Sequence, residues 1–196
     1  MEKTLLTPEP HLAEILWQHC AVKRCCCVRT VLPTGADIWR IATDLRVSPE
    51  SFLRPVPAPS AHGFALDHAQ PLIYPALARR TLSSQSAPCV FLLQFGDQAS
   101  RCGINNLRPL PCQSFPAVGV AGQIDVDTAP GCTCRSWSLA EIDREYASAL
   151  LQQEAEERER YHEAMRAWNG AVALTKRRYT FSNVCQYVLE AYEASR

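Results

Sequence analysis

The sequence predicts a mostly helical α+β fold, with a small core that holds the cysteines and a short β-hairpin, followed by a long helix and a final helix. Three observations lead to this prediction. Nine of the ten cysteines fall into three short groups before residue 135, a hairpin pattern lies inside the second group, and a helical pattern fills most of the chain after residue 137. We therefore expect a cysteine-cluster domain over residues 1–137 and a helical C-terminal extension over residues 138–196.

Helix signals dominate the first part of the chain. A capping threonine and a proline predict a helix over residues 7–19, and Thr34 is the N-cap of another. The apolar stripe after Thr34 repeats at i, i+3, i+4 and i+7 and comprises Ile38, Ile41, Ala42 and Leu45. Ser48-Pro49-Glu50 starts a second short helix. Residues 55–62 hold three prolines and should form a loop, followed by weak strands or a short helix near Leu77–Leu82.

The segment from Cys89 to Cys112 has the pattern of a β-hairpin with an exit turn. Two apolar runs flank a Gly-Asp turn signal, and Cys102 lies in the second run. Arg108-Pro109 then redirects the chain just before Cys112. We therefore expect the three thiols to converge. A second hairpin is expected about Ala121-Gly122.

The longest predicted helix begins at the capping box Ser138-Leu139-Ala140-Glu141 and ends near Asn169-Gly170. Its apolar stripe is interrupted over residues 152–160, where two Glu-to-Arg pairs have the stabilising i, i+4 spacing. These pairs are Glu154 with Arg158 and Glu156 with Arg160. We expect a solvated middle and packed ends. A final helix is expected over residues 182–194, with Cys185 in the core.

Charge and the N-terminus limit the partners and the compartment. Twenty basic and twenty acidic residues cancel, which removes the general electrostatic argument for a nucleic-acid or membrane-surface partner. The first 19 residues have no continuous apolar run, so they resemble neither a secretory signal nor a membrane span. We therefore expect a cytoplasmic protein, whose thiols stay reduced.

Reduced thiols in tight groups favour a metal site. Four thiolates bind one Zn²⁺ tetrahedrally or hold an iron–sulfur cluster. The predicted ligands are Cys20, Cys25, Cys26, Cys27, Cys89, Cys102, Cys112, Cys132 and Cys134. Which of the adjacent cysteines bind remains open, as does the choice between zinc and iron. Three of the five histidines are interpreted as surface or packing residues, namely His19, His62 and His68, while a ligand role stays open for His19 because it adjoins Cys20.

Basic residues lie beside each cysteine group, where they would balance the negative charge of a thiolate centre. These residues are Lys23, Arg24, Arg29, Arg101, Arg108 and Arg135.

Several motifs follow one another in a fixed order along residues 20–134. Adjacent cysteines lead to Asp-Ile-x-Arg-Ile, Ser-Pro-Glu-x-Phe-Leu, Cys-x-Phe-Leu, Arg-Cys-x-Ile and Arg-Pro-x-x-Cys-x-x-Phe-Pro. They lie at residues 25–27, 37–41, 48–53, 89–92, 101–104 and 108–116. This order resembles the YkgJ-type cysteine-cluster family, described as a zinc- or iron-chelating domain. The resemblance implies metal chelation by the cysteines and names no substrate.

Two classes of function follow. The first is a metal-binding cysteine-cluster protein, with zinc or iron held by thiolates. The alternative is an iron–sulfur redox or protein-modification accessory that transfers electrons to a partner enzyme. No Ser/His/Asp arrangement or Gly-rich phosphate loop stands out, so whether the chain is an enzyme remains open. A protein partner would bind through the C-terminal helices, which also leaves a structural or adaptor role open.

Overall fold

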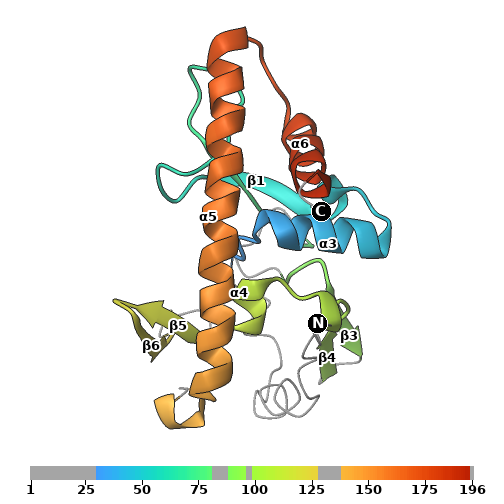
Figure 1. Cartoon of the computed structure of the whole chain (residues 1–196). Helices are drawn as coiled ribbons and strands as arrows, with labels where there is room; N and C mark the ends of the chain where they lie inside the picture. The colour runs from blue at the N-terminus through green and yellow to red at the C-terminus, as the bar shows by residue number, and fades with distance from the viewer. Residues whose placement is uncertain (1–29, 81–87, 96–98, 128–137, 195–196) are drawn as a thin grey trace, which may run out of the picture.

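The computed structural model describes residues 30–80, 88–95, 99–127 and 138–194 (Figure 1). The predicted α+β class, with a long helix and a final helix, is confirmed. In chain order the elements are α3 (Gly35–Leu45), η1 (Pro49–Ser51), β1 (Leu53–Pro57), β2 (Ile73–Leu77), β3 (Leu92–Phe95), β4 (Ala99–Cys102), η2 (Asn105–Leu107), α4 (Leu110–Gln113), β5 (Ala117–Val120), β6 (Gln123–Val126), η3 (Leu139–Glu141), α5 (Arg144–Thr175) and α6 (Phe181–Glu193). The helix expected over residues 7–19 and the loop after it lie outside these ranges.

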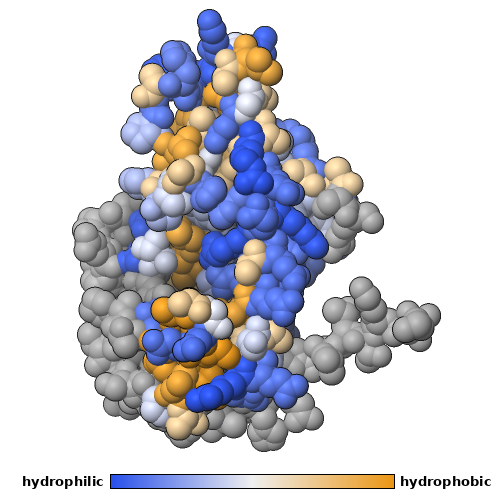
Figure 2. Space-filling view, turned by 60° about the vertical axis from the view of Figure 1, so that its left-hand side comes forward, coloured by the Kyte–Doolittle hydropathy of each residue, from blue (hydrophilic) through white to orange (hydrophobic). Residues whose placement is uncertain are grey.

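The long helix α5 runs along the whole molecule and contacts elements on both halves of its length. Its N-terminal half contacts α4 and the β5–β6 hairpin, and its C-terminal half lies beside α6, with α3 crossing near the middle (Figure 1). In Figure 2, hydrophobic residues gather on the lower part of the face that carries β5 and β6, whereas hydrophilic residues cover most of the upper part. Within the described ranges no helix has the length and apolar character that crossing a membrane requires.

One apolar core joins residues from both sides of position 137. Ile38 and Phe64 come from the first segment, and Tyr161 and Trp168 come from α5. Tyr161 has no exposed surface, and its ring centroid lies 5.6 Å from that of Phe64. Burying such large aromatic side chains is a major stabilising contribution. The helical segment therefore packs directly on the residues that precede it.

Helix α3 forms as predicted, with one exception in its buried stripe. Thr34 caps the helix through a reciprocal capping box with Asp37. Ile38, Ile41 and Ala42 are buried, but Leu45 is 39% exposed, so the prediction for Leu45 is wrong. Leu45 is the last residue of the helix, and it lies outside the apolar core. The turn begun at Ser48 forms a single 3₁₀ turn, η1, and not a longer helix.

The prediction of a loop over residues 55–62 is wrong for residues 55–57, which belong to strand β1. Pro55 pairs with Pro75 in the antiparallel register. The neighbouring pair of residues 58 and 72 is hydrogen-bonded, with Ala58 N–H donating to Leu72 O at 2.9 Å. Bonded and non-bonded pairs alternate in such a ladder, so the prolines occupy positions that need no N–H donor. Pro55, Pro57 and Pro75 therefore all fit inside a two-stranded sheet.

The two other hairpins are confirmed. Strand β3 pairs with β4, and β5 pairs with β6. The second turn has positive φ angles at Ala121 (49°) and Gly122 (80°), as a tight two-residue hairpin turn requires. Of the weak strands or short helix predicted near residue 77, the described part shows a strand, because β2 continues to Leu77 and Arg79 forms a β-bridge with Cys89.

The predicted ends of the long helix are wrong by several residues. Residues 139–141 form the 3₁₀ turn η3, and Asp143 caps α5 by accepting the Tyr146 N–H at 3.0 Å. At the other end, Gly170 lies in helical backbone and the helix continues until Lys176, where φ is 52°. Val172 is buried in the core. Its packing favours continuing the helix past the glycine.

The middle of α5 is not solvated all round, contrary to the sequence prediction. Arg158 bonds Glu154 at 2.6 Å and also donates to Tyr74 Oη at 3.3 Å. The side chain of Glu154 is only 14% exposed. The second predicted pair does not form, because Arg160 binds Glu157 at 2.9 Å and Glu156 accepts from Gln152. One face of this polar stretch therefore lies against the core.

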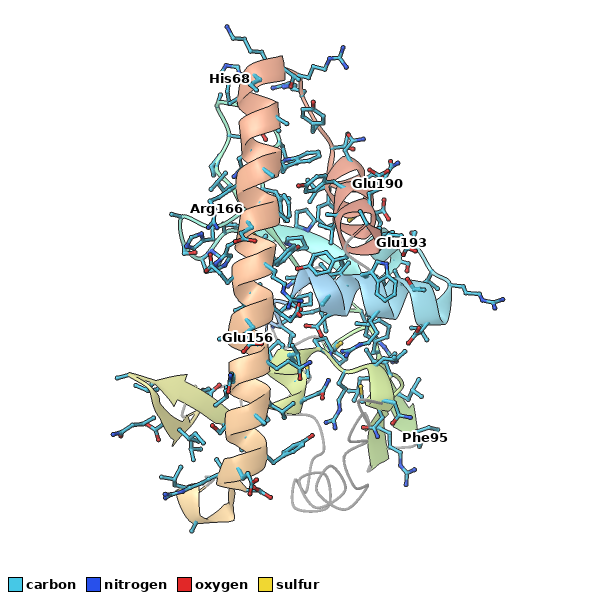
Figure 3. All side chains as sticks on the ribbon, viewed as in Figure 1. His68, Phe95, Glu156, Arg166, Glu190 and Glu193 are labelled. Carbon is cyan, nitrogen blue, oxygen red and sulfur yellow. The ribbon has the colours of Figure 1, made fainter. Side chains whose placement is uncertain are left out.

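The two glutamates are expected to differ in their contribution to stability. Glu154→Ala removes the partner of a half-buried guanidinium, so we expect the free energy of unfolding to fall by about 1–3 kcal/mol. Glu156, on the exposed face (Figure 3), provides the matched control. Glu156→Ala should cost only a few tenths of a kcal/mol, roughly the value of one exposed helical pair. Urea denaturation measures both changes, and equal small changes would mean that the middle is solvated.

A pair of stacked imidazoles joins the loop after β1 to α5. The ring centroids of His62 and His162 are 3.9 Å apart and the planes differ by 11°. Burial lowers the pKa of His162, and the charge of His62 lowers it further, while Glu159 at 4.0 Å opposes the shift. Arg158 and Arg166 on the same helix also disfavour the charged imidazole. The prediction that His62 is a surface or packing residue agrees with its exposed position and with this contact.

From the lowered pKa of His162 we expect that acid destabilises the protein. Because the folded pKa of His162 lies below the ordinary 6.5, the unfolded chain binds more protons, and stability falls as the pH drops below about 6.5. His62→Phe keeps a stacked ring without its charge, so the thermal midpoint should fall less between pH 7.5 and pH 5.5. His68→Phe, in an exposed position near the C-terminal end of α5 (Figure 3), should behave like the unaltered chain. Identical pH profiles for all three proteins would contradict this prediction.

Candidate metal centre

Three of the nine predicted ligands lie in the described part of the chain. Cys89, Cys102 and Cys112 are half-buried, and all three pack against the apolar core. The other six lie outside the described residues, namely Cys20, Cys25, Cys26, Cys27, Cys132 and Cys134. Among the described residues alone, no three His, Cys, Asp or Glu side chains form a group that could hold a metal ion. The three described thiols therefore do not complete a site by themselves.

Cys89 and Cys102 lie at the same end of the β3–β4 hairpin. Cys102 pairs with Leu92 in the register of the hairpin. The Leu92 N–H donates to Cys89 O at 3.0 Å, which closes a tight turn between them. Cys89 is also bridged to Arg79, and the Val90 N–H donates to Ala78 O at 3.0 Å. Backbone hydrogen bonds on both sides thus fix the position of Cys89.

A guanidinium lies within electrostatic range of the Cys89 thiol. Burial lowers the pKa of Arg79 and the nearby Arg54 lowers it further, whereas the charge of a Cys89 thiolate raises it. Arg79 also donates to the Thr30 hydroxyl at 3.2 Å. A neighbouring cation stabilises a thiolate, the form that binds metals. The sequence contains no signal for this role of Arg79, because 10 positions separate it from Cys89 and the bridge is tertiary.

Cys112 lies in the short helix α4, directly after a rigid turn. Its N–H donates to Pro109 O at 2.8 Å. The carbonyl of Arg108 accepts from Arg40 Nη2 at 2.9 Å and from Gln113 Nε2 at 2.6 Å. Arg108 itself donates through Nε to Asn105 O at 3.2 Å. These bonds hold the turn that leads into Cys112.

The buried carboxylate of Asp37 connects α3 to this turn. Its Oδ2 accepts from the Thr34 N–H at 3.0 Å and from the Thr34 hydroxyl at 2.9 Å. Its Oδ1 accepts from Arg40 Nη2 at 3.0 Å and from the Leu110 N–H at 3.1 Å. Burial raises the pKa of Asp37, and the Thr34 N–H and the Arg40 charge oppose that shift. Two motifs far apart in sequence therefore meet at one side chain.

Cys112 also lines a cavity of about 460 Å³ between α4, β5, α5 and residues 30–32. Its polar lining groups are Thr30, Ser114, Glu154 and Arg158. Thr30 also accepts from Arg79, the residue opposite Cys89. Thr30, the first described residue, therefore contacts both the neighbour of Cys89 and the cavity that Cys112 lines.

Cys185 differs from these cysteines, as the sequence predicts. It is 1% exposed within α6 and belongs to the apolar core. Burial raises the pKa of its thiol to about 12, so the thiol stays protonated at neutral pH. A protonated thiol is a poor metal ligand.

Replacing Asp37 should destabilise the fold through lost hydrogen bonds. In Asp37→Asn, the amide –NH₂ has to face either the two Thr34 donors or the Arg40 and Leu110 donors. We expect the free energy of unfolding to fall by about 1–3 kcal/mol in urea denaturation. Asp44→Asn changes an exposed residue of the same helix and should shift stability by less than about 0.5 kcal/mol. Similar effects of the two substitutions would contradict a structural role for the carboxylate.

The chain matches no protein-family model, no curated protein and no solved structure. A function for this chain therefore has to be derived from its own residues.

Proposed function

We propose that this chain is a metal-binding protein in which thiolates hold zinc or iron. The proposed ligands in the described part are Cys89, Cys102 and Cys112, completed by cysteines from the flanking groups, Cys20 to Cys27 and Cys132 with Cys134. One observation supports the proposal best: Thr30 accepts a hydrogen bond from Arg79, which is bridged to Cys89, and Thr30 also lines the same cavity as Cys112. The order of motifs that resembles the YkgJ-type cysteine-cluster family supports the same function.

Chain connectivity allows the flanking cysteines to reach this region. An extended chain spans at most about 3.6 Å per residue, so Cys27 lies within about 11 Å of Thr30 and Cys25 within about 18 Å. On the other side, the Asp127 N–H donates to Pro116 O at 2.8 Å, which holds residue 127 close to the turn after α4. Cys132 follows five residues later, within about 18 Å.

Hydrogen bonds hold the backbone beside Cys89 and Cys112 in place. Cys112 follows a turn held by Asp37, Arg40 and Gln113. Cys89 lies between a β-bridge and a hairpin turn. Binding groups held by rigid neighbours lose little conformational entropy when a metal binds. The nearby Arg79 would also offset part of the negative charge of a thiolate centre.

The identity of the metal separates the two function classes. An iron–sulfur cluster gives a brown protein with broad visible absorption and suits the electron-transfer alternative. A colourless protein that contains zinc by elemental analysis suits a structural or chelating role. We place the protein in a reducing compartment, because ligating thiols have to remain reduced.

The comparison of Cys112 with Cys185 tests the proposal. Cys112→Ser removes a ligand and should sharply lower the metal bound per chain, measured by elemental analysis of the purified full chain. Cys185→Ser should leave the metal content unchanged and cost about 1–3 kcal/mol of stability, because a hydroxyl replaces a buried thiol. Full metal content in Cys112→Ser would show that Cys112 is not a ligand and that the proposed site is wrong.

A further inference from the structure

We propose that the outer face of the β3–β4 hairpin is a docking surface for an acidic amphipathic helix of a partner protein. This hairpin face consists of Leu93 and Phe95 in β3 and Arg101 in β4. The inference goes beyond the proposed function, because it requires no bound metal. It places a partner on the hairpin that carries Cys102, whereas the sequence led us to expect a partner on the C-terminal helices.

Two large apolar side chains are exposed next to each other on β3. Leu93 is 45% exposed and Phe95 is 57% exposed, whereas Leu92 is completely buried. Side chains two positions apart on a strand point to the same face, so Leu93 and Phe95 share the outer face. Phe95 lies at the outer edge of the molecule, at the lower right of Figure 3. Adjacent exposed apolar side chains, unlike single ones, are typical of an interaction surface.

The side chain of Leu93 rests on the backbone of the neighbouring strand. A Cβ atom added at Gly103 would lie 3.2 Å from Leu93 Cγ and 3.3 Å from Leu93 Cδ1, so the leucine lies directly over the glycine. The Gly103 N–H donates to Phe91 O at 2.8 Å, which joins the two strands at this point. A side chain that is already ordered loses less conformational entropy when a partner binds.

Arginines give the hairpin face a positive charge. Arg101 is exposed and pairs directly with Leu93, so the two side chains belong to the same face. Among the contacts of the described residues, the guanidinium of Arg101 has no hydrogen bond or ion pair. The exposed Arg80 lies at the edge of β3, where its guanidinium donates to Leu92 O. A partner with carboxylates near its apolar side chains would therefore be complementary in charge.

The outer edge of β3 is not open to the addition of a partner strand at Leu92. Leu92 O accepts from the guanidinium of Arg80, and the Leu92 N–H donates to Cys89 O at 3.0 Å. Both backbone groups that a partner strand would need here are therefore used within the protein. A partner has to bind through side chains, which favours an amphipathic helix over an extended peptide.

A second copy of this chain and a membrane surface both fit the hairpin face less well. In a symmetric dimer the same patch faces itself, which would bring together the positive charges of Arg80 and Arg101. Like charges across an interface oppose binding. Anionic membranes attract clusters of about four to eight basic residues, more than these two arginines supply. An acidic helix instead offers carboxylates to the arginines and apolar side chains to Leu93 and Phe95.

Two model peptides test the proposal. The probe is a fluorescein-labelled peptide of about 18 residues, with Leu and Phe at helical spacing and Glu and Ala elsewhere. Fluorescence anisotropy measures its binding to the full chain, and we expect saturable binding. A second peptide with Lys in place of every Glu should bind about tenfold more weakly, because its charge opposes that of the hairpin face.

Substitutions at exposed positions locate the binding surface. Phe95→Ser should weaken binding of the acidic peptide about tenfold. Arg101→Glu should reverse the preference, so that the basic peptide binds more tightly than the acidic one. Val120→Ser is the matched control, because Val120 is 53% exposed on β5, outside the hairpin face, and this variant should bind like the unaltered chain. Circular dichroism checks that each variant keeps its fold.

Several results would overturn the proposal. These are no binding of the acidic peptide, equal binding of both peptides, and equal losses in Phe95→Ser and Val120→Ser. Self-association of the unaltered chain that Phe95→Ser abolishes, measured by sedimentation velocity, would assign the face to a second copy. Binding to phosphatidylglycerol vesicles that Phe95→Ser abolishes would assign it to a membrane. None of these measurements depends on the metal content, so the proposed metal site is tested separately.

Discussion

The arrangement of the cysteine region depends most on the hydrogen bonds that the buried Asp37 carboxylate accepts. This carboxylate lies at the start of α3, yet it accepts the N–H of Leu110 at the start of α4. The same carboxylate completes the capping box with Thr34 and binds Arg40, which in turn holds the carbonyl of Arg108. A buried carboxylate is costly unless all its lone pairs are used. Here four donors use them, so α3 and the turn before Cys112 form one unit.

Helix α5 gives this unit its second support. Tyr161, Trp168 and Val172 anchor its C-terminal half in the apolar core, which they share with α3 and α6. Further toward the N-terminus, Glu154 and Arg158 line the cavity beside Cys112 while Arg158 also contacts Tyr74 and Leu32. One ion pair therefore belongs both to the packing of the core and to the wall of the cavity. A change in the pair would affect stability and the cavity together.

These two supports fit the proposed metal centre. Cys89 is fixed by backbone pairing and Cys112 by a hydrogen-bonded turn, so neither depends on the other for its position.

Local patterns in the sequence determined much of the fold, whereas contacts between distant segments decided the rest. The cap at Thr34, the turn at Ala121-Gly122 and the core position of Cys185 depend on neighbouring residues, and the sequence alone predicted them. Strand β1 could not be predicted, because its prolines are tolerated only through their pairing with residues 73–77. The burial of Glu154 and Arg158 likewise depends on Tyr74 and Ser114, far away in sequence. The cysteine groups led to the proposed metal ligands, but the contacts of Asp37 and Arg79 arise only when folding brings together segments that the chain keeps apart.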